Sequence, residues 1–370
     1  MNIGIVTFWT TKDNYGQILQ CWALQEFLRK NGHKPFLIRY KRKSPIKSKL
    51  NLSKLIKIIF HLPKYLKLRK MIQDQNKYFQ TTNNELRKFE QFKEHHIDKT
   101  DIIYDENSIT DNPPKADAYI CGSDQIWGED DIFYLNFLPE GTKKIAYAVS
   151  MATEIKSRDD DFKRKMNKWL NGFTFIGARE YTAIEACDIV GIENSKLVVD
   201  PTLLLDSSDY EQIRESFPVS QPYLLLYIIG NPIDMDMKEV YDYAEKRGLK
   251  VIYVAVQGQV DNYEKTLPTI GEWIDLIANA ELVVTNSFHG TAFSLIFKRP
   301  FIAIPLSKFL ENKNARIKSL LENTNTLDRL YSGHLENITE REINFEKADN
   351  KIANLITFSR TTLLNEINSK

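Results

Sequence analysis

Cysteine is scarce in this sequence, with only Cys21, Cys121 and Cys187 among 370 residues. Three cysteines so far apart do not make a disulfide framework, and they lack the close spacing of a cysteine-based zinc site. The scarcity favours a reducing compartment instead. We therefore expect a cytoplasmic protein without structural disulfides.

Long apolar runs and a strong net charge are also missing. No stretch approaches the length needed to span a bilayer, and Met1 leads directly into a strand-like segment without the regions of a signal peptide. The net charge of +1 gives no general attraction to nucleic acid or membrane. The composition, 42% hydrophobic and 27% charged, is that of a globular protein, and the length favours two domains.

Several nucleotide and catalytic motifs are absent. The sequence contains no Gly-x-Gly-x-x-Gly, no Walker loop and no Gly-x-Ser-x-Gly elbow, which argues against dinucleotide or ATP binding of those types and against the hydrolases that use such an elbow. His95 and His96 are adjacent, so they do not share a helical face and make a poor metal pair. We expect neither a metal site nor a cofactor.

Strand-like and helix-like segments alternate through the first half of the chain. A buried strand at 3–8 is followed by a polar turn at 10–16, a helix that Gly32 ends, and a second strand at 35–40. Further strand-like segments lie at 117–121, 144–149, 173–178 and 197–199. This alternation is typical of a parallel sheet covered by helices.

The second half alternates in the same way. Its predicted strands are 223–229, 250–256, 282–285 and 301–304, and its predicted helices are 235–246, 270–278 and one that begins at the 286–290 loop and ends near 298. We therefore predict an α/β fold with two doubly wound parallel sheets. The predicted division is an N-terminal domain at 1–215 with a basic helical insertion at about 41–95, a C-terminal domain at 216–345, and a C-terminal helix at 346–370 that packs back on the first domain.

One segment is strongly basic. Between Phe27 and Gln73 there are fifteen Lys or Arg residues and no Asp or Glu, and 46–72 is also rich in Leu and Ile. The simplest interpretation is a set of solvated helices with a basic outer face. A second is peripheral contact of Lys41–Lys70 with the anionic inner face of the cell membrane, where each basic residue contributes roughly 1 kcal/mol. A third is capture of an anionic acceptor such as a diphosphate. Nucleic acid is disfavoured because aromatic residues are sparse and no nucleic-acid motif is present.

The strongest local pattern is the segment 283–291, where an apolar strand ends, a polar loop follows and a helix begins. In an open α/β sheet, ligands lie beyond the carboxyl ends of the strands, and the free N–H groups of a new helix favour phosphate or carboxylate. Gly290 would let the backbone approach a ligand, and His289 could exchange protons or bind an anion. The plainer alternative is a helix cap beside a satisfied histidine.

Polar residues follow other predicted strands in the same way. They are Asn14-Tyr15-Gly16-Gln17, Gly122-Ser123-Asp124-Gln125-Ile126-Trp127, Arg179-Glu180 and Asp200-Pro201. Each has a plainer alternative: a turn at a helix start, an Asp or Ser cap, a surface salt bridge and a simple turn, respectively.

Taken in order, these segments resemble the polysaccharide pyruvyl transferase family over about residues 1–330. No single piece is specific, and the resemblance rests on the ordered set. Its members are Asn14-Tyr15-Gly16 with Leu19-Gln20, Gly122-Ser123-Asp124-Gln125-Ile126-Trp127, Arg179-Glu180, Asp200-Pro201-Thr202, Ser287-Phe288-His289-Gly290-Thr291 and Arg316 with Leu320-Leu321.

The resemblance implies a GT-B-like fold of two Rossmann-like domains facing a cleft, with phosphoenolpyruvate as donor substrate. It also implies a ketal product that bridges two hydroxyls of a sugar, in a cell-surface polysaccharide or its lipid-linked precursor, and release of phosphate. We expect Arg179 to bind the donor, His289 to act as acid/base or phosphate partner, and Asp124 to take part in catalysis. The expected substrate-binding residues are Asn14, Gly16, Gln17, Ser123, Asn286, Ser287, Gly290, Thr291 and Arg316.

Two positions depart from the family's pattern. Ser287 stands where many relatives carry an arginine two residues before the histidine, so donor binding would need another cation. The candidates for that cation are Lys298, Arg299 and Arg316. Gln17 stands where many relatives have an aspartate, which leaves Asp13 or Asp124 as the base.

Two other functions are compatible with the sequence. A GT-B glycosyltransferase using a nucleotide sugar would suit the same fold. Many such enzymes carry a Glu in the helix after the His-Gly motif, however, and here no acidic residue occurs between Glu281 and Glu311. The other function is a non-catalytic sugar-binding protein of a polysaccharide assembly complex, which would show no turnover with any donor.

Overall fold

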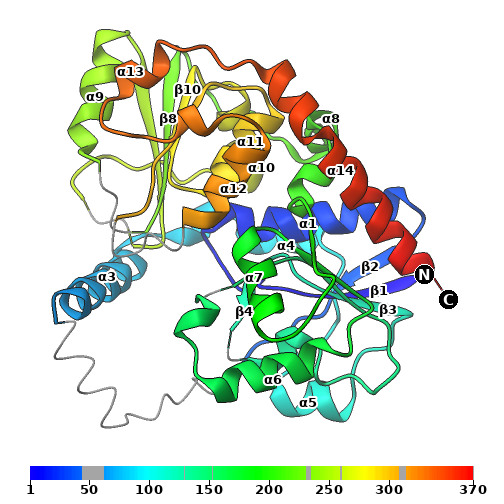
Figure 1. Cartoon of the computed structure of the whole chain (residues 1–370). Coiled ribbons are helices and arrows are strands. Elements are labelled where there is room, and N and C mark those ends of the chain that lie inside the picture. Colours follow the sequence, from blue (N-terminus) through cyan, green and yellow to red (C-terminus); the bar gives the residue numbers. More distant parts are fainter. Residues whose placement is uncertain are drawn as a thin grey trace.

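The computed structural model describes residues 1–43, 62–128, 130–151, 153–230, 235–258, 261–307 and 314–369. Figure 1 shows two β-sheets covered by helices, with the long last helix running along one side of the molecule. The predicted α/β fold with two parallel sheets is confirmed.

The first sheet is parallel and is built from residues 2–197. Its strands run in the order β2-β1-β3-β5-β6-β7, with β4 paired to β5 off this path. They are β1 (Asn2–Val6), β2 (Lys34–Leu37), β3 (Ala118–Cys121), β4 (Asp124–Trp127), β5 (Lys144–Met151), β6 (Phe175–Ala178) and β7 (Lys196–Leu197). Every residue of β5 is buried, as expected of a parallel strand covered on both faces.

The second sheet is smaller and also parallel, in the order β11-β10-β8-β9. Its strands are β8 (Tyr223–Ile229), β9 (Lys250–Val256), β10 (Leu282–Thr285) and β11 (Phe301–Ala303). Three of these have the predicted bounds, and the fourth is one residue shorter. The clear apolar runs explain this accuracy, because continuous burial leaves little choice of strand end.

Helices cover both sheets. The α-helices are α1 (Tyr15–Lys30), α3 (Leu62–Thr81), α4 (Phe89–His96), α5 (Glu106–Asp111), α6 (Asp160–Leu170), α7 (Tyr181–Ile189), α8 (Ser207–Tyr210), α9 (Met237–Lys246), α10 (Ile270–Ala278), α11 (Phe288–Ile296), α12 (Ala315–Asn323), α13 (Leu335–Thr339) and α14 (Phe345–Asn368). Two short 3₁₀ helices matter below, η1 (Asn84–Arg87) and η4 (Pro201–Leu204).

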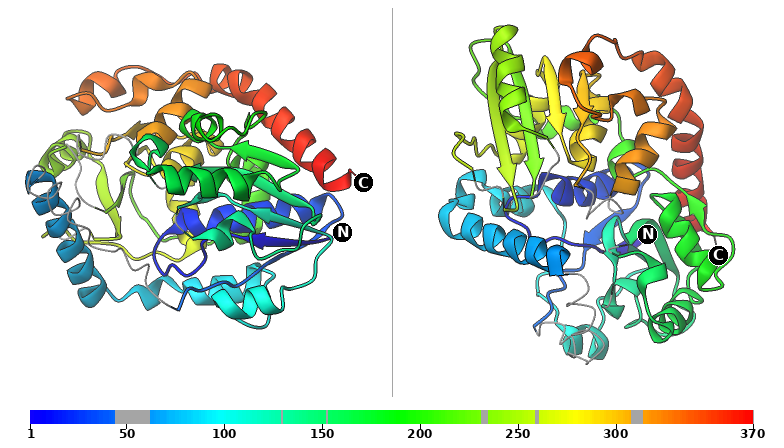
Figure 2. Two further views of the ribbon diagram at one scale, coloured as in Figure 1. Left: turned by 60° about the horizontal axis from the view of Figure 1, so that its bottom comes forward. Right: turned by 60° about the vertical axis from the view of Figure 1, so that its left-hand side comes forward.

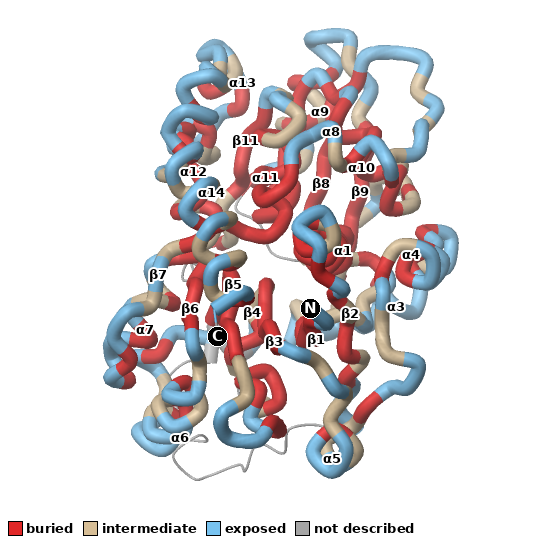
Figure 3. Tube along the Cα trace, turned by 90° about the vertical axis from the view of Figure 1, so that its right-hand side faces the viewer, coloured by how far each residue is buried: buried red, intermediate tan, exposed pale blue. Residues whose placement is uncertain are grey.

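α1 lies between the two sheets and is buried on almost every side. Twelve of its sixteen residues are buried, and its apolar side chains share one core with β1, β8, α10 and α11. In Figure 3, α1 lies between the strands of the first sheet and the elements of the second. A helix that is apolar all round belongs in an interior. The two sheets are therefore joined by one continuous apolar core.

The structure differs from the sequence prediction after β3. The sequence predicts polar site residues or an Asp or Ser cap at 122–127 and no strand there, but the second part of this segment forms β4 beside β5. Ile126 and Trp127 are fully buried hydrophobics, so extending the chain along the sheet removes their side chains from water. Ser123 is left in the short turn between β3 and β4. Elsewhere the differences are small, such as α11 ending at Ile296 rather than near 298.

α14 packs back on the first sheet, which confirms the prediction. Its Ser359 Oγ accepts a hydrogen bond from the backbone of Val199 at 3.0 Å, and its Arg360 donates to the carbonyl of Leu204 at 3.0 Å. Near its end, Lys143 Nζ donates to the carbonyl of Ile367 at 3.0 Å. Figures 1 and 2 show both ends of the chain at the same corner as a result.

The basic segment is only partly described. Residues 44–61 lie outside the described ranges, and α3, at the edge of the molecule in Figures 1 and 2, follows them. Membrane contact through Lys41–Lys70 therefore stays a prediction. Within the described ranges, no helix has both the length and the apolar character that crossing a bilayer takes.

A buried arginine ties the segment after α3 to the second sheet. Arg87 is 0% exposed, and it donates to the carbonyl of Ala255 in β9 at 2.8 Å, to Asn84 Oδ1 at 3.1 Å and to the Tyr15 hydroxyl. The Tyr15 ring stacks on Trp273 of α10, with 5.2 Å between the ring centroids. One guanidinium therefore connects η1, α1 and β9.

Replacing Arg87 should destabilise the fold. In Arg87→Met the apolar volume is largely kept, but the Tyr15 hydroxyl, Asn84 Oδ1 and the Ala255 carbonyl each lose a charged donor, so we expect a loss of about 2–4 kcal/mol in the free energy of unfolding. Urea unfolding followed by tryptophan fluorescence measures it. The matched variant Arg164→Met, at an exposed arginine of α6, should stay within about 0.5 kcal/mol of wild type. Equal unfolding midpoints for the two variants would contradict the role of Arg87.

Candidate functional site

The carboxyl ends of strands from both sheets converge on a group of charged and polar side chains. Ser123 and Asp124 follow β3, Arg179 and Glu180 follow β6, and Asp200 follows β7. His289, in the first turn of α11 after β10, approaches from the second sheet. We call these six residues, Ser123, Asp124, Arg179, Glu180, Asp200 and His289, the Arg179 cluster. Parallel strands end at the same sheet edge, so polar residues far apart in sequence meet there.

The centre of the cluster is a buried ion pair. Arg179 Nη1 lies 2.7 Å from Asp200 Oδ2, and both side chains are almost entirely shielded from water. Ser123 Oγ donates to the same Asp200 oxygen at 2.8 Å. The other Asp200 oxygen accepts from the backbone N–H and the hydroxyl of Thr202, at 3.0 and 2.8 Å. Asp200 is thus held by three neighbours, and it fixes one edge of the Arg179 guanidinium.

His289 faces this ion pair from the other sheet. Its Nε2 lies 3.7 Å from Asp200 Oδ2. Its neighbour Phe288 places a ring against the Arg179 guanidinium, 4.6 Å from the guanidinium carbon to the ring centroid. A cation over an aromatic face is stabilised in this geometry. Two consecutive residues of α11 therefore contact the first-sheet cluster.

Gly16 lets α1 approach His289 closely. A β-carbon at this position would lie 2.1 Å from His289 Nδ1 and 2.2 Å from Cγ, far inside van der Waals contact. The next residue, Gln17, donates from Nε2 to Asp124 Oδ2 at 3.4 Å. The first turn of α1 thus packs against the imidazole and also touches the Arg179 cluster.

A small hydrogen-bond ring positions Ser123. The Gln20 side chain of α1 accepts a hydrogen bond from the Ser123 backbone N–H at 3.1 Å and donates one to the Thr7 hydroxyl at 3.0 Å. The Thr7 hydroxyl in turn donates to the Ser123 carbonyl at 2.9 Å. All three residues are buried. The Leu19-Gln20 part of the sequence pattern therefore supports the turn after β3.

The ionisation of the cluster follows from burial and charge. Burial alone would raise the pKa of Asp200, but the charges of His289 and Arg179 and the hydrogen bonds from Thr202 outweigh it and hold that pKa well below its ordinary range. Burial raises the pKa of the Glu180 carboxyl above its usual value, against the opposing charge of Arg179. Asp200 is therefore the firm anion of the cluster at neutral pH.

Arg316, from the start of α12, completes the group of charges. Burial and the nearby charge of Arg179 lower the pKa of Arg316, while Asp124, Glu180 and Asp200 act in the opposite direction. The positive charges of the two guanidinium groups disfavour each other, and an anion between them would offset that repulsion. Within this group, the buried atoms without a hydrogen-bond partner among the described residues are the donors Arg179 Nε, Arg179 Nη2 and Arg316 Nε, together with His289 Nε2 and the acceptor Glu180 Oε2. Unpaired buried donors of this kind are typical of a site that binds an anion.

Five of the predicted substrate-binding residues have their polar groups engaged locally. Asn14 and Ser287 are helix caps, accepting from the backbone N–H of Gln17 at 3.2 Å and of Gly290 at 3.2 Å. Thr291 donates to the carbonyl of Ser287 at 3.0 Å. The remaining two are held by the second sheet. Asn286 bonds both backbone groups of Ile229, and a β-carbon on Gly290 would lie 2.6 Å from the Thr285 hydroxyl.

The remaining predicted residues do meet in space. They are Gly16, Gln17, Ser123, Asp124, Arg179, His289 and Arg316. The surface salt bridge considered for Arg179-Glu180 is wrong, because both side chains are buried. Of the three residues considered as a replacement for the missing arginine, Arg316 is the one found at the cluster. Lys298 pairs with Asp349 of α14 at 2.9 Å, and Arg299 lies near Tyr223, at the opposite ends of the strands.

The sequence did not predict that Asp200, Glu180 and Phe288 take part in the site. The signal for Asp200 was present, since it follows a strand just as Arg179 does, but Asp-Pro is common in turns and the sequence could not separate the two uses. Phe288 gave no signal, because an aromatic residue at a helix start is ordinarily core.

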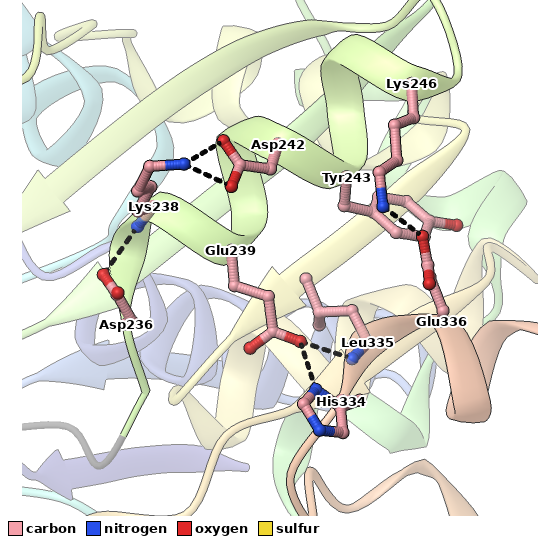
Figure 4. Close-up of a pocket in the computed structure, with 9 residues that line it drawn as sticks. All are labelled: Asp236, Lys238, Glu239, Asp242, Tyr243, Lys246, His334, Leu335 and Glu336. Carbon is pink, nitrogen blue, oxygen red and sulfur yellow. Dashed lines mark hydrogen bonds and ion pairs between the residues drawn. The ribbon is translucent and has the colours of Figure 1, made fainter.

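A separate pocket lies on the second sheet, between α9 and the segment that begins α13 (Figure 4). Its acidic and basic side chains pair with one another: Lys238 with Asp242, Lys246 with Glu336, and His334 with Glu239. Three of its four carboxylates are paired in this way, and the pocket shares no residue with the Arg179 cluster. It is not part of the candidate site.

Comparisons with known proteins agree with this geometry. A sequence model of the polysaccharide pyruvyl transferase family matches residues 14–308, which include the whole Arg179 cluster. No curated protein shows a significant match to the chain.

Similar solved structures have the GT-B fold. Anabaena Alr3699/HepE in complex with UDP-glucose has a TM-score of 0.55 at 11% identity, covering 100% of both chains. UDP-GlcNAc 2-epimerase from Neisseria meningitidis, bound to UDP-GlcNAc, has a TM-score of 0.51 at 9% identity, covering 99% of both chains. At these identities the likeness establishes the shared fold alone.

Adding one methyl group at Gly16 should disturb His289 directly. In Gly16→Ala the new β-carbon must displace the imidazole or α1, so we expect about 1–3 kcal/mol lower stability from overpacking. Thermal and urea unfolding measure the loss. Gly172→Ala is the matched control, because its β-carbon would meet only the end of Lys144 at 3.8 Å. Similar small effects at both glycines would show that the contact with His289 is not tight.

Neutralising Asp200 should give a pH-dependent loss of stability. Asp200→Asn leaves Arg179 buried without its partner charge, so we expect a loss of about 3–5 kcal/mol at pH 7. The folded pKa of Asp200 lies below its unfolded value of about 3.9, so its stabilisation is complete above that pH and is lost as the pH falls toward the folded pKa. In urea unfolding, the difference in free energy of unfolding between wild type and variant should therefore become smaller between pH 5 and pH 3, roughly one unit either side of the unfolded pKa.

The exposed Asp101→Asn serves as control and should leave the unfolding midpoint nearly unchanged at neutral pH. A gap for Asp200→Asn that stays constant as the pH falls would contradict the assignment of Asp200 as the buried anion.

Proposed function

This chain belongs to the polysaccharide pyruvyl transferase family, and we propose that it moves pyruvate from phosphoenolpyruvate to a saccharide as a ketal. The observation that carries the proposal is the Arg179 cluster with Arg316. The buried Arg179 and the partly buried Arg316 carry N–H donors that have no hydrogen-bond partner among the described residues, and a histidine from the other sheet faces the Arg179–Asp200 ion pair. A donor with both a carboxylate and a phosphate matches two such cations.

In this proposal the donor lies between Arg179 and Arg316. Asp200 holds one edge of the Arg179 guanidinium at 2.7 Å. Glu180 and Asp124 lie 3.8 Å from Nε and Nη2, beyond hydrogen-bond distance, so these two nitrogens can still donate to donor oxygens. The Phe288 ring covers the guanidinium and keeps water from one side of it. Arg316 supplies the second cation and compensates for Ser287, whose hydroxyl caps α11 instead of carrying charge.

The transfer requires a proton at carbon and two attacks by sugar hydroxyls. His289 donates a proton to the methylene carbon of the enol, and the first sugar hydroxyl adds to the neighbouring carbon while Asp124 accepts its proton. The second hydroxyl then adds to the same carbon, the C–O bond to phosphate breaks, and phosphate leaves with the electron pair and a proton. The methylene thus becomes the methyl group of the ketal, and no oxidant or reductant is needed.

Asp124 is better placed than Asp13 to act as the base. The oxygens of Asp13 are engaged by the Gln257 backbone N–H at 3.1 Å and by Thr11 at 3.1 Å, and the residue is 1% exposed. Asp124 is partly exposed. Its Oδ1 accepts from the backbone N–H of Gln125 at 2.8 Å and lies 3.8 Å from Arg179 Nη2, whereas its Oδ2 receives only a long hydrogen bond from Gln17 at 3.4 Å. A carboxylate with one weakly engaged oxygen at the edge of the cluster can accept a proton from an incoming hydroxyl.

A nucleotide-sugar glycosyltransferase is the second candidate, favoured by the GT-B fold and by the UDP-sugars bound to the two similar structures. Against it, α11 carries no acidic side chain after His289 to hold ribose or sugar hydroxyls. The two candidates differ in the donor that stabilises the folded protein. A ligand that binds only the folded state raises the melting temperature, so phosphoenolpyruvate and UDP-glucose can be compared directly.

The direct test is phosphate release from phosphoenolpyruvate with a panel of hexosides and lipid-linked oligosaccharides. We expect release that depends on the acceptor, with the mass of one pyruvate ketal gained by the sugar, and a thermal shift with phosphoenolpyruvate. His289→Asn should lower turnover roughly 10²–10⁴-fold, because general acid catalysis contributes about that much. His95→Asn, at an exposed histidine of α4, should keep wild-type turnover. A thermal shift with UDP-glucose alone, and no phosphate release, would favour the glycosyltransferase.

A further inference from the structure

A polar pocket of about 550 Å³ adjoins the Arg179 cluster on the far side of Gln17. Its walls come from the loop before α1, the end of α3 with η1, and the segment after β9. Lining residues used below are Lys12, Asp13, Gln17, Phe79, Asn83 and Gln257. The volume is in the range of small-molecule sites. No residue of this pocket belongs to the Arg179 cluster, but Gln17 contacts both.

The pocket combines planar polar groups with one aromatic ring. Carboxamides, carboxylates and threonine hydroxyls make up most of its lining, and such groups can both donate to and accept from sugar hydroxyls. Phe79, near the end of α3, is 49% exposed although its neighbour Tyr78 is buried. An exposed ring beside a polar hollow offers an apolar surface for the C–H face of a sugar ring.

The charges of the pocket favour a neutral ligand. Lys12 is the single cation among the lining residues, and it is paired with Glu85 at 2.5 Å. Asp13 is the other carboxylate, so no unpaired positive charge is present to bind a uronic acid or a phosphate. An anionic sugar would bring a like charge toward two carboxylates.

We propose that this pocket is a subsite for neutral sugar units of the acceptor, with Phe79 as its stacking surface. That the bound sugar is the acceptor rests on the proposed function. Gln17 links the pocket to the reacting centre, since its amide lies 3.4 Å from Asp124 and the preceding residue packs on His289. A saccharide whose reacting unit lies at Gln17 and Asp124 extends its neighbouring unit over Phe79. The pocket thereby selects acceptors longer than one sugar and uncharged at that unit.

Binding can be measured without any donor, by ligand-observed NMR titration with the methyl β-glycosides of glucose, galactose, mannose and glucuronic acid. We expect at least one neutral glycoside to bind, with its strongest saturation transfer on ring C–H protons, and the glucuronide to bind more weakly than the glucoside. Phe79→Ala should weaken binding roughly tenfold, which is about 1.4 kcal/mol. Phe79→Tyr should restore it, because the ring is kept.

Two further variants make the test specific. Asn83→Ala removes an exposed amide of the pocket and should also weaken binding, whereas Phe358→Ala, at a 41% exposed phenylalanine of α14, should leave it unchanged. Equal affinity of wild type and Phe79→Ala, equal affinity for glucoside and glucuronide, or no binding of any neutral glycoside would each overturn the proposal. Sugar binding that depends on Phe79, together with no phosphate release from phosphoenolpyruvate, would instead keep the subsite and reject the proposed reaction.

Discussion

The ion pair between Arg179 and Asp200 is the constraint on which the site depends. Removing two charges from water costs several kcal/mol per ion, so the pair is tolerable only if its remaining hydrogen-bonding capacity is also satisfied. Ser123 and Thr202 satisfy Asp200, and His289 approaches the same carboxylate from the second sheet. The segments after β3, β6 and β7 are therefore fixed relative to one another by one carboxylate.

Arg179 is satisfied on one side only. One of its nitrogen atoms bonds Asp200, while the other two have no hydrogen-bond partner among the described residues. Nearby Arg316 is in the same condition, with an unpaired Nε and a pKa lowered by burial and by Arg179. Unpaired buried donors cost stability, so their retention is more easily explained by a ligand than by the fold. This asymmetry connects the energetics of the ion pair to the proposed donor site.

The close packing of α1 against α11 brings the two halves of the site together. Gly16 permits the contact with His289, and the surrounding apolar core is continuous between the sheets. Arg87 adds a polar link between η1, α1 and β9 through Tyr15, the residue that precedes Gly16. The same packing leaves a polar hollow beside Gln17, where Phe79 is exposed. The reacting centre and the adjoining subsite thus lie on either side of the first turn of α1.

The sequence by itself determined most of the strands, β4 excepted, because continuous apolar runs such as 223–229 and 250–256 are typical of buried parallel strands in an α/β protein. It also determined where site residues would be found, namely after strand ends. It did not determine which of them face a ligand, since a polar side chain at a strand end can equally cap a helix, as Asn14 and Ser287 do. The tertiary structure decided this, because only the folded sheets show which strand ends lie side by side. It places Asp200, which the sequence could equally assign to a turn, at the centre of the site.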